Sequence, residues 1–107
     1  MKGQRKFKRL SLSRSCYVIS NGFLINGSTA DLSASGCSLA LDSNVQLTER
    51  SKVQLVINAE EISVDGLVID MSVAWVRGCM IGCEFMFPND KVKIAYYKLL
   101  GYLNENE

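Results

Sequence analysis

Two arginines near the start of the chain, Arg5 and Arg9, stand four positions apart. Guanidinium groups donate paired hydrogen bonds to phosphate oxygens and to the O6 and N7 acceptors of guanine, and they also stack on purine faces. Six of the 12 basic residues lie in the first 14 positions, and no acidic residue precedes Asp31. Such a basic segment attracts phosphate, although a solvated tail has the same composition.

A second pattern, Asp31-x-Ser33-x-x-Gly36, follows about 22 residues later, between two expected strands. A carboxylate can accept hydrogen bonds from the N1–H and the exocyclic amine of guanine, whereas adenine cannot present this pair of donors. The serine hydroxyl can bond phosphate, base or backbone. The glycine tolerates a positive φ and lets a ligand approach closely. Taken alone, the pattern also fits an Asx or Ser turn.

Common catalytic and metal-binding sets are missing from the sequence. The chain has no histidine, so Ser-His-Asp and Cys-His arrangements are unavailable, and it has no glycine loop ending in Gly-Lys-Ser/Thr. Its four cysteines form no CxxC pair. We therefore expect neither an enzyme nor a metal site.

Length and composition favour one globular domain. The chain has 107 residues, of which 48% are hydrophobic and 21% charged. The basic N-terminus lacks the apolar stretch of a signal peptide, and no run approaches the roughly 18 apolar residues of a membrane span. We expect a cytoplasmic protein with reduced thiols.

Short alternating segments in the first half of the chain predict antiparallel strands. Residues 23–30 are expected to form a strand that is interrupted near Asn26-Gly27, and Asn21-Gly22 is a turn signal. The remaining strands expected here are residues 16–20, 37–41 and 53–57.

The pattern over residues 62–76 is less regular. Leu67 and the alternate residues up to Trp75 share one parity, so Trp75 is expected in the core or against a helix. A change of phase near Asp65-Gly66 predicts a bulge or bend at the glycine. A turn at residues 70–72 fits equally well.

The last third of the chain changes from period 2 to a helical period. Residues 79–87 alternate, which assigns Cys79 and Cys83 to the core as small apolar residues. After Pro88, apolar residues recur at helical spacing, and Asn89 or Asp90 can cap the helix. The prediction is a mainly β protein, with six or seven strands in a small antiparallel barrel or sandwich and one C-terminal helix.

The order of these features resembles the PilZ family, whose signature pairs Arg-x-x-x-Arg with a later Asp-x-Ser-x-x-Gly. Arg5 and Arg9 match the first part, and Asp31, Ser33 and Gly36 match the second. The late segment Ile81-Gly82-Cys83-Glu84-Phe85 is similar to the family's Gly-x-x-Phe strand. The resemblance covers residues 5–103.

The resemblance implies a PilZ-type barrel that binds cyclic di-GMP, with a flexible basic arm in residues 1–14 and the barrel and helix in residues 15–107. Arg5 and Arg9 would hold the phosphates and guanines, Asp31 and Ser33 would contact a guanine, and Gly36 would keep the wall clear. Gln4 and Lys8 are secondary candidates. The implied mechanism is ordering of the arm on the ligand, which a partner protein then recognises.

Two other functions fit parts of the sequence. A PilZ-like adaptor would act through protein contacts without nucleotide. A nucleic-acid-binding barrel would use the basic arm for phosphates and exposed strand aromatics for stacking. We expect no nucleic-acid partner and a monomer or weak dimer, while the number of nucleotides per chain and the process controlled stay open.

Overall fold

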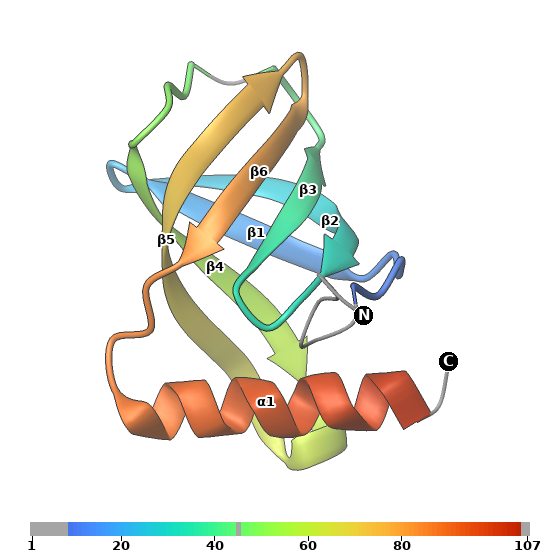
Figure 1. Cartoon of the computed structure of the whole chain (residues 1–107). Coiled ribbons are helices and arrows are strands. Elements are labelled where there is room, and N and C mark those ends of the chain that lie inside the picture. Colours follow the sequence, from blue (N-terminus) through green and yellow to red (C-terminus); the bar gives the residue numbers. More distant parts are fainter. Residues whose placement is uncertain (1–8, 45, 106–107) are drawn as a thin grey trace, which may run out of the picture.

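The computed structural model describes residues 9–44 and 46–105 and shows six strands followed by one long helix (Figure 1). The elements are β1 (Ser15–Ser20), β2 (Phe23–Leu32), β3 (Gly36–Leu41), β4 (Lys52–Ala59), the short 3₁₀ helix η1 (Glu60–Ile62), β5 (Val64–Arg77), β6 (Met80–Phe85) and α1 (Asp90–Glu105).

The strands close into one antiparallel barrel in the order β1-β2-β3-β6-β5-β4. Closure is made by β1 and β4, where Cys16 lies opposite Ile57. The mainly β fold with a six-stranded barrel and a C-terminal helix is therefore confirmed. A closed barrel leaves few unpaired strand edges, because each strand has a neighbour on both sides.

The first hairpin forms where the sequence predicts it. Asn21 and Gly22 adopt φ values of 51° and 82°, and Ser20 lies opposite Phe23. Two consecutive positive φ values are typical of the type I′ turn that joins tightly paired strands. The interruption expected in the next strand is wrong, because β2 is continuous through Asn26 and Gly27.

Bulges in β2 and β5 change which side chains face the interior. In β2 the register against β3 shifts between Thr29 and Asp31, leaving Ala30 as the extra residue. In β5 the register against β6 shifts between Val73 and Trp75, leaving Ala74 as the extra residue. A one-residue insertion reverses the alternation of the residues that follow it.

The alternatives left open for residues 62–76 are resolved in favour of the bend at the glycine. The register of β4 against β5 shifts between Ile57 and Ala59, opposite Asp65 and Gly66. The expected turn at residues 70–72 is absent, since these residues pair with residues 52–54 inside one uninterrupted strand.

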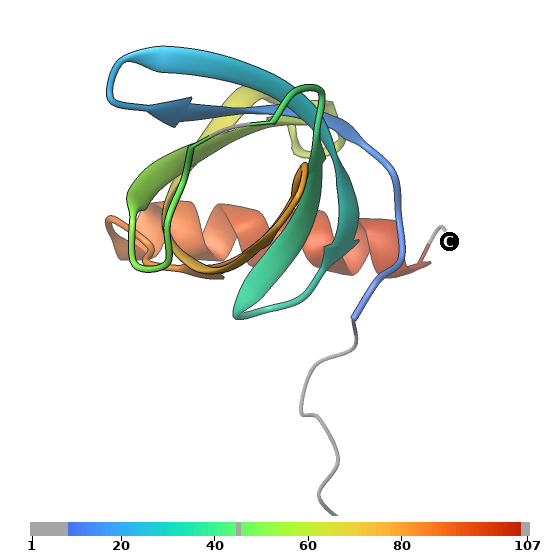
Figure 2. The same ribbon diagram turned by 90° about the horizontal axis from the view of Figure 1, so that it is seen from above.

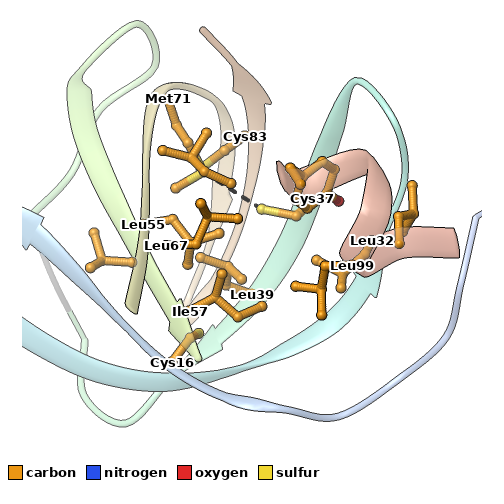
Figure 3. Packing of buried hydrophobic residues seen from close by; sticks show 14 of the residues in the cluster. Cys16, Leu32, Cys37, Leu39, Leu55, Ile57, Leu67, Met71, Cys83 and Leu99 are labelled. Atoms are coloured by element: carbon orange, nitrogen blue, oxygen red, sulfur yellow. Dashed lines mark hydrogen bonds between the residues drawn. The ribbon is translucent and has the colours of Figure 1, made fainter. Parts of the chain in front are cut away.

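Inward side chains from all six strands fill the barrel (Figure 3). Val18, Leu39, Leu55 and Ile57 are fully buried. The four cysteines are free thiols, and Cys16, Cys37 and Cys83 are buried among these residues. Cys79 differs from the expectation: it lies before β6, is only half-buried, and donates to the Oδ1 of Asn44 at 3.1 Å.

Helix α1 lies across one end of the barrel (Figure 1). Asn89 caps it, because its Oδ1 accepts the Val92 N–H at 2.9 Å. The apolar stripe expected from the sequence faces the barrel, with Tyr96, Leu99 and Leu103 buried in the common core. Phe85 and Phe87 pack on the Tyr96 ring, with centroids 4.8 and 5.8 Å away, as expected for helix-contacting residues.

Candidate functional site

The two alanine bulges create a row of outward-facing residues across four adjacent strands. Asp31 on β2 lies opposite Ser38 on β3, Ser38 lies opposite Gly82 on β6, and Gly82 lies opposite Trp75 on β5. The neighbouring residues in these strands, such as Leu32 and Val73, are buried in the core. Without the bulges, Asp31 and Trp75 would share the inward parity of Thr29 and Val73.

Trp75 is the clearest departure from the sequence prediction. Its expected place in the core or against the helix is wrong, since it is half-buried on the outer wall and lines an open pocket there. Its indole lies across Gly82, where a Cβ atom would come within 2.1 Å of Trp75 Nε1. Arg77 covers part of the ring, with its guanidinium carbon 5.3 Å from the centroid.

The turn between β2 and β3 is built from Ser33 and Gly36. The Ser33 hydroxyl accepts the Gly36 N–H at 3.2 Å and donates to the Gly36 carbonyl at 3.1 Å, which also accepts the Ser33 N–H at 2.9 Å. The hydroxyl's donor is therefore already used. The Ser33 oxygen keeps one lone pair that can accept a hydrogen bond from a ligand. It can therefore bind an N–H of a base but not an unprotonated phosphate oxygen.

The positive φ that the sequence allows for Gly36 is not used, and the structure shows a packing reason for the glycine. Its φ is not positive. A Cβ at this position would instead meet the Cys83 carbonyl oxygen at 2.3 Å. The glycine lets the backbones of β3 and β6 approach each other directly beneath the pocket.

Helix α1 supports the same turn from below. The Tyr96 hydroxyl donates to the Ser33 carbonyl at 2.7 Å, and the ring is completely buried. Burial raises the pKa of Tyr96 well above its usual value, with a smaller contribution from the neighbouring Cys37. The phenol therefore stays protonated and keeps donating over the physiological pH range.

Arg9 reaches this site because the chain before β1 pairs with the end of β2. Leu10 N–H donates to the Leu32 carbonyl at 2.7 Å, and Leu32 N–H donates back at 2.9 Å. Leu10 is buried, while the Arg9 side chain is 53% exposed, with Nε 4.0 Å from Asp31 Oδ1. Of the other predicted residues in this segment, Gln4, Arg5 and Lys8 lie outside the described residues.

The next residues of this segment are fixed to the barrel. The buried Thr29 hydroxyl accepts the Arg14 N–H at 2.9 Å and donates to the Leu12 carbonyl. The Arg14 guanidinium binds both carboxylate oxygens of Glu61, at 2.5 and 2.8 Å. These hydrogen bonds lower the pKa of the Glu61 carboxyl. The attachment lies inside the range of residues 1–14 that the resemblance assigns to the arm.

Arg9, Asp31, Ser33 and Gly36 all line one open pocket of about 240 Å³ on the outer wall. The structure adds lining residues that the sequence analysis did not select, and these are Ser35, Cys37, Ser38, Ala74, Trp75, Gly82, Cys83 and Glu84. Ser38, Gly82 and Glu84 carried a usable signal, because their strand parity already placed them outside the barrel.

The charges of the pocket suit a base better than a phosphate. Asp31 and Glu84 contribute two carboxylates, and Arg9 is the one cation among the described lining residues. A floor with an excess of acceptors attracts the N–H donors of a base edge and repels an anion. Any phosphate at this site needs further cations beside Arg9.

Neither a metal-binding cluster nor a membrane-spanning helix is found in the described part of the chain. Residues 9–44 and 46–105 contain no group of three or more His, Cys, Asp or Glu side chains arranged to hold a metal ion. Within these same ranges, α1 and η1 both lack the length and apolar character that crossing a membrane requires.

Several solved structures share this fold. The PilZ domain of CeSA from a cellulose-synthesizing bacterium has a TM-score of 0.76 at 14% identity, over 91% of this chain and 98% of the other. The Bacillus subtilis inhibitor of motility MotI/DgrA has a TM-score of 0.74 at 12% identity, over 99% of this chain and 55% of the other.

The K. pneumonia MrkH–c-di-GMP complex has a TM-score of 0.73 at 20% identity, over 95% of this chain and 52% of the other. The chain thus spans about half the length of MotI and MrkH. At these identities the likeness concerns the fold.

The sequence itself identifies the family. No curated protein matches the chain, but the family model described as PilZ domain matches residues 3–99. That range includes both motifs, the outer-wall row and most of the helix. The chain belongs to the PilZ domain family.

Proposed function

We propose that the protein is a cyclic di-GMP receptor without catalytic activity, in which a guanine lies on the outer-wall row and the phosphates are held by the N-terminal arginines. The observation that carries the proposal is the pocket that brings Arg9, from the segment before β1, together with Asp31, Ser33 and Gly36 at the β2–β3 turn. The similar structure of MrkH, which was solved with c-di-GMP, supports the same ligand class.

Asp31 and Ser33 supply the selectivity for guanine in this proposal. The Asp31 carboxylate accepts from the guanine N1–H and exocyclic amine, and the remaining Ser33 lone pair accepts a further N–H. Adenine presents an acceptor at N1, so it cannot donate there to the Asp31 carboxylate, whose side chain is only 23% exposed. Trp75 offers a flat apolar surface on the opposite side of the same row for stacking.

The arm completes the site. The pocket is smaller than the about 300–1,000 Å³ of most small-molecule sites, and its floor is net acidic. We propose that Arg5, with Gln4 and Lys8 as secondary contacts, approaches the ligand from the solvent side. Because Leu10 is attached to β2, the part that closes over the dinucleotide is residues 1–9, a shorter arm than residues 1–14.

Ordering of this arm is the proposed signal. The dianionic ligand offsets the repulsion among the arginines and lysines of the segment and places them on the barrel wall. The resulting surface exists only in the liganded protein and is what a partner protein would recognise. The free thiols of the described residues fit a reducing compartment such as the cytoplasm.

Isothermal titration calorimetry of the full chain with cyclic di-GMP, with GTP and cyclic di-AMP as controls, tests the proposal. Binding of cyclic di-GMP alone is the expected outcome. Absence of binding would favour the protein-only adaptor, and equal binding of cyclic di-AMP would rule out guanine selection by Asp31. Trp75 is the sole tryptophan of the chain, so its fluorescence should change in step with the heat.

Arg9→Ala should weaken cyclic di-GMP binding by about 10- to 100-fold, because one charged hydrogen-bonding contact contributes roughly 1.5–3 kcal/mol. Lys98→Ala on the exposed side of α1 removes the same charge from a residue that does not line the pocket and should leave the affinity unchanged. Calorimetry in which Arg9→Ala binds as tightly as the wild type would remove Arg9 from the site.

A further inference from the structure

We propose that two copies of the chain associate by pairing the outer edge of β2 at residues 23–25, called the hairpin edge below, with the same edge of the second copy. This inference does not depend on nucleotide binding. Figure 2 shows the β1–β2 hairpin extending beyond the rest of the barrel wall, so the edge is accessible to a second molecule.

The hairpin edge lacks a neighbouring strand among the described residues. β2 pairs with β1 from Phe23 onward, but it pairs with β3 only from Gly27 onward. The last contact on that side is the Asp42 N–H, which donates to the Asn26 carbonyl at 2.9 Å. The barrel is therefore closed along most of β2 and open at its first three residues.

The backbone of Leu24 points its polar groups toward this open side. In an antiparallel pair, successive residues direct their N–H and C=O groups alternately toward one neighbour and the other. Phe23 closes the turn opposite Ser20, so Leu24 faces away from β1, in phase with Asn26, whose carbonyl binds Asp42. Leu24 thus carries one donor and one acceptor that are unpaired among residues 9–44 and 46–105 and that a second chain can satisfy.

The side chains at this edge are apolar and exposed. Phe23 is 74% exposed and Leu24 is 58% exposed. Residues 15–30 contain no charged residue and no proline. Exposed strand edges in monomeric proteins are usually protected by lysine, proline or a bulge, and the hairpin edge has none of these.

A second copy fits this edge because the edge is complementary to itself. With a two-fold axis at Leu24, the Leu24 N–H of each copy donates to the Leu24 carbonyl of the other. Phe23 then lies opposite Ile25 of the second copy, so apolar side chains meet and no like charges approach. The pairing uses up the edge on both copies, and it therefore gives a closed dimer and not a filament.

Sedimentation velocity or light scattering from about 10 µM to 1 mM protein, without nucleotide, tests the dimer. The contact is short, and we expect a dissociation constant on the order of 100 µM. The expected result is an increase in average mass toward twice that of one chain. A constant mass of one chain up to 1 mM overturns the proposal.

Two variants at Leu24 locate the contact. Leu24→Pro removes the outward N–H without removing a bond to β1, and Leu24→Lys introduces like charges at the two-fold axis. Each should raise the dissociation constant at least tenfold, while Val68→Lys, at a 40% exposed position on β5, should not. Unchanged association of either folded variant overturns the proposal.

Hydrogen exchange gives a readout that needs no variant. The Leu24 amide should exchange more slowly at 1 mM than at 20 µM protein, because pairing protects it, whereas exposed amides elsewhere should not change. A Leu24 exchange rate that is independent of concentration contradicts the two-fold pairing even if the protein dimerises by another surface.

Discussion

Gly82 has no space for a side chain, because the indole of Trp75 occupies the position a Cβ would take. Gly82→Ala should therefore push Trp75 off the pocket floor, shift its fluorescence to longer wavelength and weaken cyclic di-GMP binding at least tenfold. Gly66→Ala is the matched control, since its Cβ would make an ordinary 3.5 Å contact with Val56. Wild-type fluorescence in folded Gly82→Ala would show that Trp75 has not moved, and wild-type affinity with a shifted fluorescence would show that binding does not need Trp75 in its present position.

The Arg14–Glu61 pair fixes the chain just before β1. Glu61→Gln should lower the free energy of unfolding at pH 7 by about 1 kcal/mol, as for a partly exposed bidentate pair. Arg14 lowers the pKa of Glu61 in the folded state below its usual value of 4.5. The stabilisation is thus present above pH 4.5 and disappears as the pH falls through the folded pKa.

Chemical denaturation at several pH values from 7 down to 3 checks this behaviour. The difference in unfolding free energy between the wild type and Glu61→Gln should shrink as the pH falls. Glu60→Gln, at the exposed neighbouring position in η1, should show little difference at any pH. If the loss of unfolding free energy in Glu61→Gln is constant with pH, the loss does not come from the carboxylate charge of Glu61.

At the scale of elements, the glycine in α1 weakens its last turns. Gly101 is exposed, and a Cβ there would meet no atom within 4 Å. Gly101→Ala should raise the free energy of unfolding by about 0.5–1 kcal/mol, because alanine has the higher helix propensity. Gly78→Ala should destabilise the protein instead, since its surroundings are equally open but its φ is +61°. Thermal unfolding of both variants tests whether the signs are opposite.

Strand parity predicted the barrel but not all of the site, and the difference lies in the bulges. Alternation placed Leu39, Leu55 and Ile81 in the interior, where they are fully buried. The bend at Asp65-Gly66 was predictable because glycine marks it. The bulges at Ala30 and Ala74 carry no such signal, because alanine fits both regular strands and bulges. Alternation therefore predicts the wrong side of the wall for Trp75.

The motif residues were found without any parity argument. Asp31, Ser33 and Gly36 were selected by type and spacing, and the structure brings them to one pocket with Arg9. Sequence spacing could not reveal that the Ser33 hydroxyl is engaged with Gly36, or that Tyr96 holds the same turn. Both contacts depend on where the chain returns in space.

For the molecule as a whole, the barrel interior protects three thiols. Burial raises the pKa of Cys16 to about 11 and that of Cys83 to about 12, and it raises the pKa of Cys37 as well. A buried neutral thiol reacts slowly with alkylating agents. One cysteine per chain, the half-buried Cys79, should therefore react quickly with iodoacetamide at pH 8.

The other three thiols should react only as fast as the barrel opens. Mass spectrometry of labelled protein over time separates the two phases, and Cys79→Ser should abolish the fast one. Rapid labelling of a second cysteine in the native protein would indicate a barrel that opens locally near that residue.

The hydrogen bond between the Tyr96 phenol and the Ser33 carbonyl has a consequence for how the protein can be observed. The ring of Tyr96 lies among Phe85, Phe87 and Tyr97. Its hydroxyl contacts the turn between β2 and β3, which borders the candidate nucleotide pocket. Any tightening of that loop must alter the asymmetry around this aromatic group. Near-ultraviolet circular dichroism of Tyr96 should therefore report ligand binding in the pocket, although the ring lies on the opposite side of the barrel wall. No label is needed.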